Sequence, residues 1–85
     1  MLAILSSNLC VFIAHSLLVL HDFSSSKQLF IHQNTKPYAT LHYSNQLLYV
    51  GETGNNGEIQ IFRVQDNHLN RVQVLKGHKK GVKWI

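Results

Sequence analysis

Short apolar runs separated by polar turns recur along the whole chain, and this pattern is typical of β-strands. No stretch has a sustained helical period. The runs predict strands over residues 9–13, 17–20, 28–32, 38–43, 46–50, 58–64 and 71–75, with a further strand opening at 82–85. The sequence therefore predicts an all-β meander.

Polar and glycine-rich segments mark the expected connections. Residues 24–26, 44–45 and 65–70 are expected to be turns or loops, and Pro37 prevents regular strand pairing before residue 38. The strongest hairpin signal is Asn56-Gly57, because both residues tolerate the positive φ angles of tight turns. With Gly51 and Gly54 this pair predicts a hairpin bend. No Gly-Lys-Ser/Thr follows, so the glycines do not match a phosphate-binding loop.

The first twenty residues contain no Lys, Arg, Asp or Glu, which raises the possibility of a signal peptide or membrane anchor. The stretch has no basic start, and Ser, Asn and His interrupt it. It divides into two apolar runs joined by Ala14-His15-Ser16, which favours two buried strands. A small membrane-tethered protein, held by residues 1–20, stays an alternative.

The same order of elements occurs twice. His21-Asp22 corresponds to Phe62-Arg63 at an offset of 41 residues, and the segment from Phe30 corresponds to that from Val74 at an offset of 44. We assign the three-residue difference to the polar loop 65–70. Units of about forty residues with four strands, joined near a Gly-His such as Gly77-His78, are typical of WD40 propeller blades.

These features predict part of an open WD40-type β-propeller with about two antiparallel four-stranded blades. The expected division is a partial first blade over 1–35, a second blade over 36–78 and the start of a third over 79–85. Because a propeller closes only with about four to eight blades, two blades leave open faces and edges.

A narrower resemblance is carried by Gly51-Glu52-Thr53-Gly54, by residues 59–63 and by the segment Leu75-Lys76-Gly77-His78-Lys79-Lys80-Gly81-Val82. Upstream, Val19-Leu20-His21-Asp22 and Lys36-Pro37 match the same pattern. The chain resembles the opening blades of the WD-repeat scaffold family that includes the mitogen-activated protein kinase-binding protein and its mitotic-spindle relatives. This resemblance implies a noncatalytic scaffold that binds other proteins in the cytoplasm, at the cytoskeleton or at the centrosome.

The chain also departs from that family. Many WD blades contain a buried hydrogen-bonded set that includes a His and a Trp. Here Phe62 replaces the Trp, Arg63 replaces the following Asp, and Asn34 stands at the joint of the second blade in place of His. We therefore expect apolar packing to provide most of the stability of the second blade.

Composition narrows the chemistry. The four acidic residues show no catalytic pairing and are expected at turns and in solvent, and no nucleophile motif surrounds a serine. The six histidines lack metal-ligand spacing, so neither an enzyme, a metal nor a cofactor is expected. The single cysteine, Cys10, is expected to be a small buried apolar residue.

The net charge of +4 is concentrated towards the end of the sequence, in Arg71, Lys76, Lys79, Lys80 and Lys83. Such a cluster can attract phosphates, which leaves a basic nucleic-acid-associated module as an alternative function. A solvated blade loop explains the charges more simply, because only one aromatic residue, Trp84, lies among them.

Overall fold

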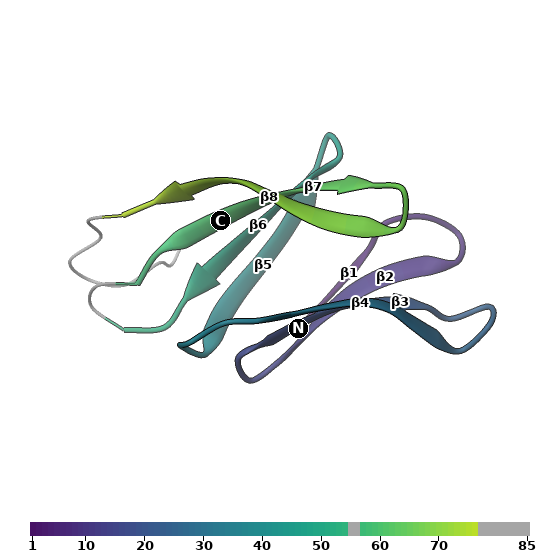
Figure 1. Ribbon diagram of the computed structural model, residues 1–85, viewed down its shortest axis with the longest axis horizontal. Helices are drawn as coiled ribbons and strands as arrows, with labels where there is room; N and C mark the ends of the chain where they lie inside the picture. The colour runs from purple at the N-terminus through teal and green to yellow at the C-terminus, as the bar shows by residue number, and fades with distance from the viewer. Residues whose placement is uncertain (55–56, 77–85) are drawn as a thin grey trace.

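The computed structural model describes residues 1–54 and 57–76, and eight β-strands run through this part of the chain. They are β1 (Leu2–Ile4), β2 (Leu9–Ala14), β3 (Leu17–Asp22), β4 (Lys27–Gln33), β5 (Tyr38–Ser44), β6 (Leu47–Glu52), β7 (Ile59–Gln65) and β8 (His68–Leu75). Neighbours in sequence pair antiparallel to give sheet 1 (β1–β4) and sheet 2 (β5–β8). The two sheets face each other and are not closed into a barrel (Figure 1). The prediction of two antiparallel four-stranded sheets is confirmed.

Tight hairpins set the ends of the strands. Asn45 and Gln46 between β5 and β6, and Asp66 and Asn67 between β7 and β8, have positive φ angles of 51° to 66°. Two consecutive residues with positive φ are the requirement of a type I′ turn, which matches the twist of the strands it joins. The prediction that Gln46 begins a strand was therefore wrong. The expected loop 65–70 is likewise only a two-residue turn.

The first twenty residues belong to sheet 1. Val11, Leu18 and Leu20 are fully buried, and they pack in one apolar core with Leu48 and Phe62 of sheet 2. Burial of each such side chain contributes about 1.5–3 kcal/mol. Among the described residues, no helix is long and apolar enough to cross a membrane.

The two sheets correspond strand by strand in register, apart from an irregularity at Tyr38/Thr40 between β5 and β6 that has no counterpart between β1 and β2. Each has an irregularity between its third and fourth strands, at Leu20/His21 in sheet 1 and at Ile61/Phe62 in sheet 2. These two positions are 41 residues apart, which is the offset read from the sequence for the third strands. A row of paired residues across sheet 1 is Leu2, Phe12, Val19 and Ile31, and the corresponding row in sheet 2 is Leu41, Val50, Gln60 and Val74.

The register of the two sheets corrects the offset of 44 residues that the sequence suggested for the fourth strands, β4 and β8. Ile31, and not Phe30, is the counterpart of Val74, so the offset is 43 and not 44. The additional residues of sheet 2 are also not in a loop. Strands β7 and β8 stay paired as far as Gln65 and His68, whereas β3 and β4 end at Asp22 and Lys27. The extra length therefore extends the hairpin.

Both faces of each sheet carry apolar residues. Because side chains alternate along a strand, the row Leu2, Phe12, Val19 and Ile31 lies on the outer face of sheet 1, opposite to the row that packs on sheet 2. The outer face of sheet 2 carries a separate cluster in which Leu47, Tyr49 and Leu75 pack on the buried Ile59 and Ile61. Apolar residues on both faces are expected of a sheet that lies between two others.

Candidate functional site

The segment between β4 and β5 joins the two sheets by its backbone. The amide of Asn34 donates to the carbonyl oxygen of Ser16 at 2.9 Å, and the amide of Tyr38 donates to that of His15 at 2.9 Å. On the other side, the amide of Thr53 donates to the carbonyl oxygen of Pro37 at 3.0 Å. The connecting segment is therefore bonded both to a hairpin of sheet 1 and to the end of β6.

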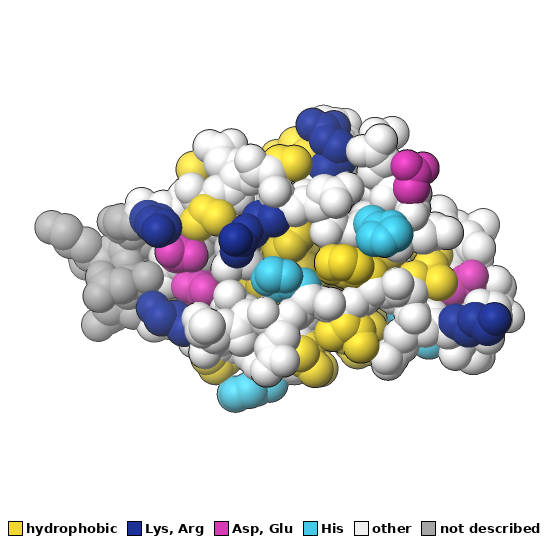
Figure 2. All heavy atoms as spheres, in the orientation of Figure 1, with side chains coloured by type: hydrophobic (Ala, Val, Ile, Leu, Met, Phe, Trp, Pro, Cys, Tyr) yellow, Lys and Arg dark blue, Asp and Glu magenta, His cyan; other side chains and the backbone are white. Residues whose placement is uncertain are grey.

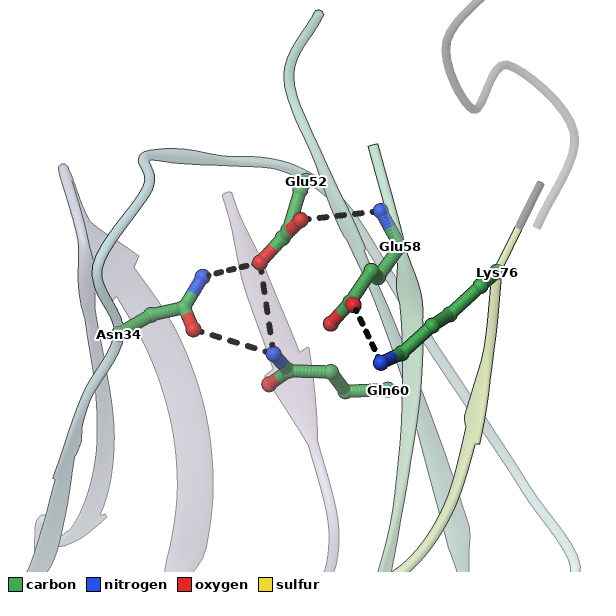
Figure 3. Close-up of polar contacts among 5 residues, drawn as sticks. All are labelled: Asn34, Glu52, Glu58, Gln60 and Lys76. Atoms are coloured by element: carbon green, nitrogen blue, oxygen red, sulfur yellow. Dashed lines mark hydrogen bonds and ion pairs between the residues drawn. The ribbon is translucent and has the colours of Figure 1, made fainter. Parts of the chain in front are cut away.

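A polar cluster lies at this joint and is formed by Asn34, Tyr38, Glu52 and Gln60, which we call the joint cluster. Figure 3 shows Asn34, Glu52 and Gln60 of this cluster. Nδ2 of Asn34 donates to Oε2 of Glu52 at 2.7 Å. Nε2 of Gln60 donates to Oδ1 of Asn34 at 3.0 Å and, more weakly, to Oε2 of Glu52 at 3.5 Å. Three segments distant in sequence thus meet in one hydrogen-bonded ring.

The second carboxyl oxygen of Glu52 connects the joint cluster to the start of β7. Oε1 accepts a hydrogen bond from the backbone amide of Glu58 at 2.9 Å (Figure 3). The backbone amide of Glu52 in turn donates to the carbonyl oxygen of Glu58 at 2.9 Å. Glu52 therefore holds the β6–β7 hairpin closed while its other oxygen bonds to the joint between the sheets.

Tyr38 completes the cluster from β5. Its hydroxyl donates to Oε1 of Gln60 at 2.6 Å, and its ring packs in the apolar core. Burial, reinforced by the nearby Glu52 carboxyl, raises the pKa of the Tyr38 hydroxyl well above its usual range. The hydroxyl therefore keeps its proton and stays a hydrogen-bond donor at all ordinary pH values.

The joint cluster overturns one expectation. Glu52 is 3% exposed and Gln60 1% exposed, so Glu52 is not the solvent-facing acid that the sequence suggested. Asn34, at the joint position, bonds to both of these buried side chains, so polar contacts add to the apolar packing of sheet 2. Buried polar groups cost about 1–3 kcal/mol each when they lack partners, so this mutual bonding is required for stability.

Of the residues predicted to form the hairpin bend, Gly51 lies in a strand instead. Gly51 lies within β6 and pairs with Ile59. Gly54 has a φ of 95°, a conformation that favours glycine, and a Cβ on Gly57 would lie 2.7 Å from the carbonyl oxygen of Glu52. Asn56 lies outside the described residues. The glycines thus allow the close approach of backbone that the Glu52–Glu58 contacts need.

Two of the five residues of the predicted basic surface lie in the described part of the chain. Arg71 and Lys76 are exposed, and Nζ of Lys76 lies 3.6 Å from Oε2 of Glu58. Figure 2 shows the Lys and Arg side chains of one face in several separate groups. Lys79, Lys80 and Lys83 lie outside the described residues, as do Gly77 and His78 of the predicted blade joint.

Two of the described histidines, His21 and His32, pack against phenylalanine rings. The ring of His32 lies 5.2 Å from that of Phe62, and burial together with the Arg71 charge lowers the pKa of His32. Nδ1 of His21 is buried without a hydrogen-bond partner beside Phe12. Within 1–54 and 57–76 no three His, Cys, Asp or Glu residues are grouped to hold a metal ion.

The joint cluster holds the β4–β5 segment against sheet 2. Each of its polar side chains bonds to another member, and its residues come from the β4–β5 segment and from three strands of sheet 2. Sequence reasoning identified the position of Asn34 but missed Tyr38, Glu52 and Gln60. The sequence did contain one indication of Gln60. Side chains alternate along a strand, so Gln60 lies on the same face of β7 as Phe62 and Val64 and is the one polar residue of the three.

Fold and site together define an all-β protein in which two register-matched sheets are joined by a buried polar cluster. No protein-family model matches the chain, and no curated protein or solved structure matches it significantly.

Proposed function

We propose that this chain forms two adjacent blades of a WD-repeat β-propeller and acts as a noncatalytic scaffold that binds other proteins. The observation that carries the proposal is the matched register of the two sheets, with the same strand order and the same irregularity 41 residues apart. Repetition of a four-stranded antiparallel unit at about this spacing is a property of propeller blades.

The way in which the sheets stack supports the same proposal. First strand lies near first strand and fourth near fourth, since β1 contacts β5 and β4 contacts β8. Blades arranged around an axis stack in this order, and their inner strands lie together. In the proposed propeller, the joint cluster takes the place of the His- and Trp-containing set of other WD blades, with Asn34 at the position of the joint His.

The hydrogen bonding of the joint cluster supports a scaffold role. The joint cluster fixes two sheets relative to each other, and its donors and acceptors are used in doing so. A rigid pair of blades presents hairpin turns such as Asn45-Gln46 and Asp66-Asn67, which are exposed and suited to contact other proteins. The partner class that the family resemblance suggests is a mitogen-activated protein kinase.

Calorimetric titration of the 85-residue chain with a purified mitogen-activated protein kinase tests this function. We expect saturable binding that changes little with salt and that is lost in a Glu52→Ala variant, in which the joint is broken. The matched control is Glu58→Ala, which removes an exposed ion pair and should bind as the wild type does.

A parallel titration with a short DNA duplex distinguishes the alternative. Binding to phosphates would weaken with salt, with a slope of about −0.9 in log–log form for each phosphate neutralised. Steep salt-dependent binding to DNA, with none to the kinase, would contradict the scaffold proposal and favour the basic module.

A further inference from the structure

The outer face of sheet 1 carries exposed apolar side chains on both of its edge strands. Its row Leu2, Phe12, Val19 and Ile31 crosses all four strands, and Ile4 and Cys10 lie beside it. On the edge strands Leu2 and Ile4 are each 58% exposed and Ile31 is 50% exposed, whereas between them Phe12 is half-buried and Val19 and Cys10 are buried. None of these six side chains is charged. An uncharged row that extends across a whole sheet differs from isolated exposed apolar residues, which need no explanation.

The register of the molecule indicates what fits this face. The row is the counterpart of Leu41, Val50, Gln60 and Val74, which lies on the inner face of sheet 2. In the monomer, the inner face of sheet 2 is covered by the inner face of sheet 1, where Val11, Leu18 and Leu20 are fully buried. The outer face of sheet 1 should therefore fit a sheet face that resembles the inner face of sheet 1.

The same chain carries such a face. Ile59 and Ile61 are the counterparts, 41 residues later, of Leu18 and Leu20. They lie on the outer face of sheet 2, where Tyr49 is the counterpart of Val11 and remains half-buried. The outer face of sheet 1 thus corresponds to the inner face of sheet 2, and the outer face of sheet 2 corresponds to the inner face of sheet 1. The two outer faces could therefore pair as the two inner faces do.

We propose that a second copy of this chain docks on the outer face of sheet 1 through the outer face of its own sheet 2. The contact is heterologous, because a different face of each copy takes part, and its repetition leads to a ring or an open stack. Each copy then continues the order of sheets found within the monomer.

The expected strength follows from the size of the faces. Four strands spaced by about 4.8 Å and about 20 Å long offer a few hundred Å² per copy. This is less than the roughly 800 Å² per partner of a standard stable interface. Association is therefore expected to be weak and to depend on concentration, with monomer dominant in dilute solution.

Sedimentation equilibrium of the 85-residue chain over a wide concentration series tests the proposal. We expect self-association that Ile31→Lys on one face and Tyr49→Lys on the other each weaken about tenfold or more, since either buries an unpaired charge. The matched control is Val72→Lys, at a residue that is also 50% exposed but lies at the β7–β8 irregularity, and it should associate like the wild type.

A mixture of the two face variants gives the sharpest result. Each retains the face that the other has lost, so an equimolar mixture should form a one-to-one pair that cannot grow further. Circular dichroism and thermal unfolding establish that each variant is folded, and Ile4→Lys and Leu75→Lys serve as substitutes on the same two faces.

Three results would overturn the proposal. They are a wild-type chain that stays monomeric at every concentration, a Tyr49→Lys variant that self-associates as strongly as the wild type, and a mixture of face variants that does not pair. The second result would indicate that like faces meet.

Discussion

The rows Leu2–Phe12–Val19–Ile31 and Leu41–Val50–Gln60–Val74 occupy the same place in the two sheets, yet their surroundings are opposite. The first row is apolar throughout and lies on an outer face, with both of its end residues at least half exposed. The second is covered by sheet 1 and holds a polar residue, Gln60, that is 1% exposed. The central counterparts Val19 and Gln60 are 2% and 1% exposed, so both rows are buried at their centre. The rows differ at the edge strands, where Leu2 and Ile31 are exposed but Leu41 and Val74 are partly buried.

Phe62 and His21 sharpen this comparison because they are counterparts on the third strands. Phe62 is 1% exposed within the core, whereas His21 is half-buried on the outer side of sheet 1. Phe62→Ala should destabilise the fold by about 3–5 kcal/mol, a large part of the roughly 4–13 kcal/mol expected for a domain of this length. His21→Ala should cost less than about 1 kcal/mol. Urea unfolding measures both, and equal losses would contradict the assignment of inner and outer faces.

Glu52 and Glu58 allow the same chemical change to be made inside and outside the joint cluster. Glu52→Gln places an amide NH₂ against groups that are already donors, and it should cost about 1–3 kcal/mol. Glu58→Gln removes only the ion pair with Lys76, whose side chain is 74% exposed, and should cost less than about 1 kcal/mol. Urea unfolding at neutral pH compares the two. A larger loss for Glu58→Gln would be inconsistent with a stabilising role for the joint cluster.

Tyr38→Phe removes the hydroxyl that donates to Gln60 and should cost about 1 kcal/mol at neutral pH. The raised pKa of Tyr38 also makes stability depend on alkaline pH. Above the ordinary tyrosine pKa of about 10 the unfolded chain loses this proton while the folded chain keeps it, so stability falls as pH rises. Unfolding measured on both sides of that pH should show a steeper loss for the wild type than for Tyr38→Phe. Identical slopes would show that this hydroxyl is not buried as described.

His32 is expected to give the smallest effect, at acidic pH. Its pKa is lowered in the folded chain by burial and by Arg71, so the unfolded chain binds a proton more readily. The contribution of His32 is present above the ordinary histidine pKa of about 6.5 and is lost as pH falls through the lower folded value. His32→Leu keeps the contact with Phe62 and should reduce the acid sensitivity of thermal unfolding. His42→Leu, at an exposed position, is the control for the loss of an imidazole.

The sequence predicted the parts of this structure that depend on neighbouring residues. Alternating apolar positions located the strands, and the pair His21 and Phe62 gave the offset of the third strands. The two-residue turn Asp66-Asn67 was missed because Gln65, His68 and Asn70 are polar. Those three are exposed strand residues, and solvent tolerates them as it tolerates a loop.

The joint cluster could not be predicted in the same way. Asn34, Glu52 and Gln60 come from three segments, and the hydrogen bonds among them form only when the β4–β5 segment lies against β6 and β7. The sequence carries no local signal for such a contact, since Glu52 follows a strand and precedes glycines as a surface turn residue does. The internal polar residue Gln60 was the one available indication, and its meaning depends on the face that it occupies.

Two register-matched sheets face each other and are joined by the joint cluster. NMR on the isotope-labelled chain tests this arrangement through proton–proton contacts between the sheets. We expect cross-peaks between the rings of His32 and Phe62 and between those of Phe30 and His68, together with protected side-chain amide protons on Asn34 and Gln60. Cross-peaks confined to strand pairs within each sheet, with freely exchanging amides on both residues, would contradict it.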